Sequence, residues 1–110
     1  MKHYVIDELR PQDYEQIKKH LETRLDDSGI EGIYWIPLEK ELLTDLQLAH
    51  TECGPLFFAV ALEPGLLSCE LLVRTRNKLQ CDCMAYATEA QRNWIINWAD
   101  RIFELLGLHS

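Results

Sequence analysis

The residue types that bind metal or act as nucleophiles gather in the middle of this chain. They are one histidine and three cysteines: His50, Cys53, Cys81 and Cys83. Zinc takes four thiolate or imidazole ligands in a tetrahedral arrangement, and closed sites of three cysteines and one histidine are structural. Because residues three apart on a helix lie side by side, His50 and Cys53 can form half of such a site. One hypothesis is therefore a small zinc-binding protein with Zn at these four residues.

The spacing of the later cysteines speaks against that hypothesis. Cys81 and Cys83 are one residue apart, and on a regular strand such residues have Cα atoms roughly 6.5 Å apart, so a shared metal needs a bulge between them. In a simple meander the central strand would also separate Cys81 from the segment that carries His50 and Cys53. Free cysteine is among the residue types most often buried, so core thiols without a cofactor are the preferred interpretation.

Cys53 is the candidate for covalent chemistry. A nucleophilic or redox cysteine needs a lowered pKa, access to solvent and a neighbouring base or positive charge. Cys53 falls in a predicted turn close to His50, but no third group that would orient the pair can be identified. A cysteine-dependent enzyme is thus the third hypothesis, after an interaction module and a zinc protein. No catalytic residue is assigned, and the chain is not expected to be an enzyme.

Composition and charge limit the class of protein and its partners. The 110 residues are 47% hydrophobic and 26% charged, which predicts one globular domain over residues 1–110. Eighteen acidic and eleven basic residues give a net charge of −7, which opposes binding to nucleic acid or to an anionic membrane surface. The N-terminus has no apolar signal-peptide region, and no apolar run approaches the roughly 20 residues that span a bilayer. We expect an acidic, cytoplasmic protein.

Two helices are predicted to pack on a central sheet. Pro11 opens an N-terminal helix over about 11–25, and Thr88 with Gln91 forms a capping box that opens a long C-terminal helix over about 88–106. The apolar side of the C-terminal helix is broad and should be the main lid on the core. Its members are Trp94, Ile95, Trp98, Ala99, Ile102, Phe103 and Leu106.

Shorter elements are predicted between these helices and before them. Residues 4–6 and 33–36 are β-prone, and the second run is stopped by Pro37. The segment 38–52 is ambiguous, because its apolar residues keep a helical period while Thr44 and Gln47 form a capping box that would begin a separate helix at Asp45. One helix or two elements both fit the pattern.

A three-stranded meander over about 56–86 forms the centre of the predicted fold, an α+β domain with a three- to four-stranded antiparallel sheet. Alternation defines its register, since a slip of one residue would send every side chain to the other face. The expected apolar pairs of the first hairpin are Leu62 with Leu67, Val60 with Cys69, Phe58 with Leu71 and Leu56 with Val73. Those of the second are Val73 with Cys81, Leu71 with Cys83 and Cys69 with Ala85.

The opposite face of this sheet is half apolar, which is unusual for a face in solvent. Its apolar residues include Phe57, Ala59, Ala61, Leu72, Met84 and Tyr86. Exposed apolar patches commonly mark interaction sites, so these residues are the candidate dimer or partner interface. Alternatively, the first helix or segment 38–52 covers them within one chain. We expect a non-enzymatic protein-interaction or ligand-binding module that self-associates through this face.

Overall fold

The structure is a computed structural model that describes residues 2–25, 30–49, 55–75 and 85–108. In chain order its elements are β1 (His3–Ile6), α1 (Pro11–Arg24), β2 (Ile33–Pro37), the 3₁₀-helix η1 (Lys40–Leu42), α2 (Asp45–Ala49), β3 (Leu56–Glu63), β4 (Leu66–Thr75), β5 (Ala85–Tyr86) and α3 (Glu89–Leu106). The predicted α+β class, with a long C-terminal helix and a shorter N-terminal one, is confirmed.

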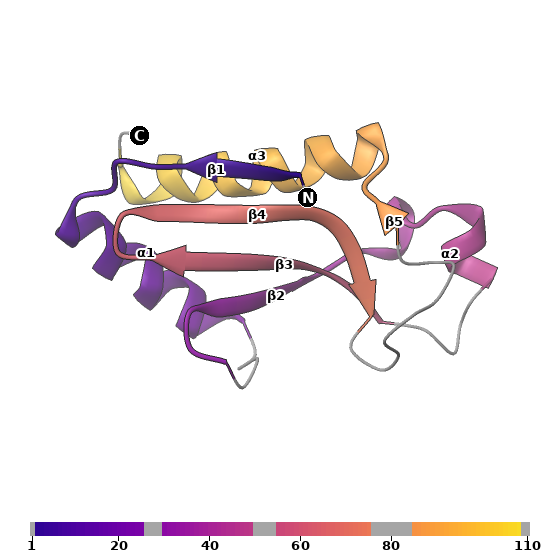
Figure 1. Ribbon diagram of the computed structural model, residues 1–110, viewed down its shortest axis with the longest axis horizontal. Helices are drawn as coiled ribbons and strands as arrows, with labels where there is room; N and C mark the ends of the chain where they lie inside the picture. Colours follow the sequence, from indigo (N-terminus) through magenta and orange to yellow (C-terminus); the bar gives the residue numbers. More distant parts are fainter. Residues whose placement is uncertain (1, 26–29, 50–54, 76–84, 109–110) are drawn as a thin grey trace.

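The strands form one antiparallel sheet in the order β1-β4-β3-β2, and β5 pairs with a further part of β4. Helices α1 and α3 lie behind this sheet in Figure 1, on the same side of it. The fold therefore has two layers, with helices on one face of the sheet.

The core lies between these layers. Along β3 every second side chain is buried, from Leu56 to Leu62, and β4 keeps the same alternation at Leu67, Cys69 and Val73. Helix α1 contributes Ile17 and Leu21, and α3 contributes four residues to the same cluster: Ile95, Ala99, Ile102 and Phe103. Trp94 and Trp98 of α3 are half-buried and pack against the cluster from its side. The C-terminal helix is thus a lid on the core, as its pattern predicted.

Both helix starts follow the sequence signals. Thr88 caps α3, and its side chain accepts a hydrogen bond from the backbone N–H of Gln91. Proline opens α1, while the buried carboxylate of Asp13 accepts hydrogen bonds from the backbone and the guanidinium of Arg10. This carboxylate at the N-terminal end of α1 also suits the helix dipole. The sequence analysis missed the contact between Arg10 and Asp13.

The segment after β2 consists of two elements and not of one helix. Thr44 and Gln47 form the predicted capping box: the Thr44 N–H donates to the Gln47 side chain at 2.9 Å, and the Gln47 N–H donates to the Thr44 hydroxyl at 3.2 Å. Helix α2 accordingly begins at Asp45, separately from η1. Residues 50–52, the last part of the predicted helix, lie outside the described residues.

The side-chain amides of the two capping boxes meet. Gln91 Nε2 donates to Gln47 Oε1 at 2.9 Å and to the carbonyl of Leu42 at 2.8 Å. Both glutamines are buried, with 1% of Gln91 and 5% of Gln47 exposed. A buried polar group is costly unless it is hydrogen-bonded, so this contact ties the segment after β2 to the start of α3, on the helical side of the sheet.

The first hairpin has the predicted pairs only near its turn. Val60 lies opposite Cys69 and Leu62 opposite Leu67, as expected. The two further pairs are wrong, because Phe58 lies opposite Val73 and Leu56 opposite Thr75. The cause is an irregularity in which Glu70, Leu71 and Leu72 lie opposite Ala59 alone. Since β4 gains an even number of residues there, alternation continues and the predicted core face is preserved.

The second hairpin also differs from the prediction. Ala85 pairs with Val73 and not with Cys69, and Tyr86 pairs with Leu72. Strand β1 occupies the edge of β4 where the meander was expected, so that Tyr4 is the neighbour of Cys69 on that side. The predicted partners Cys81 and Cys83 lie outside the described residues.

Candidate functional site

The structure does not test the predicted metal ligands or the predicted nucleophile. His50, Cys53, Cys81 and Cys83 all lie outside them. Within the described ranges, no three histidine, cysteine or acidic side chains are grouped so as to hold a metal ion. The zinc and cysteine-enzyme hypotheses therefore stay predictions.

Cys69 is the cysteine that the structure describes, and it lies in the core as predicted. Burial, followed by the negative charge of Asp100, raises the pKa of its thiol to about 12. Since the thiolate is the reactive form of cysteine, a thiol with this pKa is inert at neutral pH. Cys69 is a structural residue.

The face of the sheet turned away from α1 and α3 is the candidate site, and we call it the open face. Side chains at alternate positions of β2, β3 and β4 point to it. Its apolar members on these strands are Ile33, Trp35, Phe57, Ala59, Ala61, Leu66 and Leu72, all half-buried. No helix in the described ranges covers this face (Figure 1).

The alternative that segments of this chain cover the open face is wrong for the segments the structure describes. Helix α1 buries Ile17 and Leu21 in the core, on the other side of the sheet. Leu38 and Leu43, from the segment after β2, pack against the same core. Both elements that were expected to compete for the open face belong to the helical layer.

The predicted interface residues are brought together on the open face as far as they are described. Phe57, Ala59 and Ala61 alternate along β3, while Leu72 of β4 pairs with Tyr86 of β5. Tyr86 is 54% exposed at the margin of the face. The sixth predicted residue, Met84, lies outside the described residues.

Sequence reasoning predicted strands at residues 4–6 and 33–36 but did not place them on the open face, where they are β1 and β2. Trp35 of β2 contacts Phe57 edge-on, with ring centroids 5.8 Å apart and planes at 73°. On the opposite edge of the sheet, Val5 of β1 is 47% exposed. The alternation of each strand contained the signal, but assigning it to this face required knowing that β2 borders β3 and that β1 borders β4.

One ion pair interrupts the apolar surface. The guanidinium of Arg74 donates to the carboxylate of Glu70, with Nη2 3.2 Å from Oε2 and a closer contact through Nε. This hydrogen bond raises the pKa of Arg74. Arg74 lies opposite Phe57 in the ladder, so the charged pair borders the aromatic part of the open face. Charge on this part of the surface is locally balanced, in contrast to the acidic chain as a whole.

Shallow cavities lie on the helical layer, lined by described residues. One, of about 300 Å³, lies between α1 and the end of α3 and is lined by Gln16, Lys19, His20, Thr23, Arg24 and Leu106. The other, of about 350 Å³, is lined by Glu39, Trp94, Asn97, Trp98 and Arg101. Trp94 also stacks on the buried ring of Phe58, with centroids 6.3 Å apart, so the tryptophan side of the second cavity is continuous with the core.

No helix within the described ranges has the length and apolar character needed to cross a membrane. No protein-family model, curated protein or solved structure matches the chain. Function must therefore be inferred from the geometry of the open face and of the cavities.

Proposed function

We propose that this chain is a cytoplasmic, non-enzymatic interaction module that forms a homodimer through the open face of its sheet. One observation carries the proposal: both long helices lie on one side of the sheet, while the other side presents a half-apolar surface that no described helix covers. A solvated antiparallel face usually alternates with polar residues. An uncovered surface of this composition favours burial against a partner.

The chemistry of the open face suits a second copy of the same chain. In a two-fold contact the same patch lies on both sides, so its groups have to be self-complementary. The aromatic and aliphatic side chains around Phe57 can pack against their own copies. Glu70 and Arg74 supply one charge of each sign, so each can face the opposite charge across the two-fold axis. Aromatic residues and arginine are enriched at protein interfaces.

Light scattering coupled to gel filtration tests the proposal over a dilution series. We expect the wild-type mass to fall from dimer to monomer on dilution, and Leu72→Glu to be monomeric throughout, because it buries an unpaired charge in the contact. The matched control is Leu105→Glu, since Leu105 is 67% exposed on α3 and belongs to the helical layer. It should dimerise like the wild type, and circular dichroism should show that both variants are folded.

The outcomes separate the two parts of the proposal. A wild-type chain that stays monomeric at the highest concentration would exclude self-association through this face. Equal loss of the dimer in both glutamate variants would place the contact elsewhere or reflect a general effect of added charge.

A further inference from the structure

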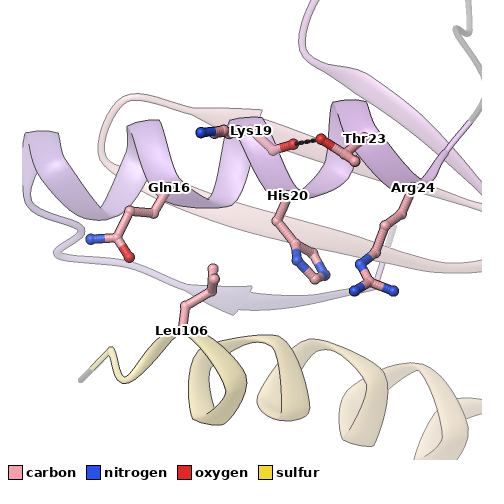
Figure 2. A pocket seen from close by; sticks show the side chains of 6 residues that line it. All are labelled: Gln16, Lys19, His20, Thr23, Arg24 and Leu106. Atoms are coloured by element: carbon pink, nitrogen blue, oxygen red, sulfur yellow. Dashed lines mark hydrogen bonds between the residues drawn. The ribbon is translucent and has the colours of Figure 1, made fainter.

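The cavity between α1 and α3 gathers basic side chains in an acidic protein. Gln16, His20 and Arg24 follow one another at intervals of four residues, which places them on one face of α1. Figure 2 shows their side chains extending toward α3, while Leu106 extends from α3 toward them. The result is a shallow hollow with two basic groups and an amide on one wall and an apolar group on the other.

Two further residues of α1 complete the hollow. Lys19 also lines it and is a third basic residue. The Thr23 hydroxyl donates to the carbonyl of Lys19 at 2.7 Å, which fixes its proton and leaves its oxygen as an acceptor. Within the described part of the chain, neither Lys19 nor Arg24 forms an ion pair. The hollow therefore holds basic side chains that form no ion pair with a described carboxylate, although the whole chain has a net charge of −7.

His20 is the titratable side chain of the hollow. Burial, and then the positive charge of Arg24, lowers the pKa of His20 below its ordinary value of 6.5. The charged lining residues from α1 are Lys19 and Arg24, and the residue from α3 is the uncharged Leu106. A bound anion would oppose both causes of the shift, because it stabilises the protonated imidazole by charge and by hydrogen bonding.

We propose that this hollow binds the carboxylate or phosphate group of a small organic anion. Arg24 would contact the oxyanion with its planar guanidinium, which matches such groups in geometry and charge. His20 and Gln16 would donate N–H groups, and an apolar part of the ligand would lie against Leu106. A volume of about 300 Å³ is at the small end of the range for ligand sites, which favours a small molecule. The site is on the helical layer, so it does not depend on dimerisation through the open face.

NMR titration of the histidine side chains of the full chain tests this inference, with sodium phosphate and sodium butyrate as separate probes and sodium chloride at matched ionic strength as reference. His20→Gln identifies the His20 signal by its loss. We expect at least one probe to shift this signal saturably and to raise the pKa of His20, while chloride does not. A response to phosphate alone assigns a phosphate group, and a response to butyrate assigns a carboxylate with an apolar chain.

Two arginine variants decide whether the response is specific. Arg24→Gln should weaken binding by about tenfold or more, since charge-assisted hydrogen bonds are lost. Arg92→Gln removes the same charge from an exposed position at the start of α3 and should leave the affinity within about twofold, because exposed charges at a distance are screened by salt. The exposed His3 should not respond. The proposal is overturned if neither probe shifts His20 beyond chloride, or if both arginine variants weaken binding equally.

Discussion

The two faces of the sheet are made by the same strands but differ in how deeply their side chains are buried. On the covered face, Phe58 and Val73 are paired across β3 and β4 and are fully buried under the helices. On the open face, the adjacent pair Phe57 and Arg74 is half-buried. A displacement of one residue along the ladder thus changes a core position into a surface position, because successive side chains of a strand point to opposite faces. The covered face forms the core, and the open face is the surface through which we propose that the chain self-associates.

The two faces also differ in how their polar and apolar groups are buried. On the helical side the buried amides of Gln47 and Gln91 satisfy each other and nearby backbone groups. Among described residues, every fully buried side-chain nitrogen or oxygen has a hydrogen-bond partner. On the open face it is apolar groups that lack burial. The buried polar groups of the covered face are paired within one chain, whereas the open face is the surface that we propose a second copy of the chain buries.

The largest expected contrast is between the two neighbouring phenylalanines. Phe58→Ala should lower the free energy of unfolding by about 3 to 5 kcal/mol, because it leaves a cavity in the core. Phe57→Ala should lower it by only about 1 kcal/mol in the monomer, the loss of an aromatic contact at a half-exposed position. Urea unfolding at a concentration where the wild type is monomeric measures both. Equal losses would mean that the open face is as well packed as the core.

The amide contact on the helical side provides the next test. Gln91→Ala should cost about 1 to 3 kcal/mol, because it removes part of the α3 cap and leaves the buried Gln47 and Leu42 groups without this donor. Gln12→Ala is the matched control at an exposed position in the first turn of α1, and it should change stability by less than about 0.5 kcal/mol. Thermal unfolding followed by circular dichroism compares them. A neutral Gln91→Ala would show that the contact contributes no net stability.

The last expected effect concerns the stability of the covered face at alkaline pH. The pKa of Cys69 is raised from 9.0 to about 12 by burial and by Asp100. The unfolded thiol ionises first, so the stabilising contribution of this group is complete below pH 9 and is lost as the pH rises toward 12. The limiting slope is about −1.4 kcal/mol per pH unit.

The Cys69→Ala variant isolates that contribution. It should be less stable than the wild type at pH 8 because of the cavity, but its stability should fall less steeply between pH 9 and 11. Tyr4 is present in the wild type and in the variant, and it adds a loss of stability at alkaline pH to both. Its hydroxyl donates to Asp100 at 2.6 Å, and this hydrogen bond, followed by burial, raises the pKa of Tyr4 to about 12. Parallel pH profiles for the two proteins would contradict the assignment to Cys69.

The comparison of the two faces also shows which residues of the candidate sites could be predicted from the sequence. Phe57, Ala59 and Ala61 could be assigned to one face from alternation alone. Trp35 and Val5 could not, since their strands join the sheet from distant parts of the chain. The basic hollow was equally hidden: Gln16, His20 and Arg24 share a face by spacing, but only packing brings Leu106 against them.

The sequence by itself determined the local elements and their orientation. Pro11 and the capping boxes at Thr44 and Thr88 placed the helix starts, and strict alternation along residues 56–62 defined the core face, because caps and side-chain periods act between neighbours in the chain. Only the tertiary structure decided that β1 borders β4 at Cys69, that both helices share one side, and that Gln47 meets Gln91. Many apolar strands fit a given sheet edge about equally well, so the choice among them depends on how the whole chain packs. In the resulting packing, no helix of the described residues lies on the open face.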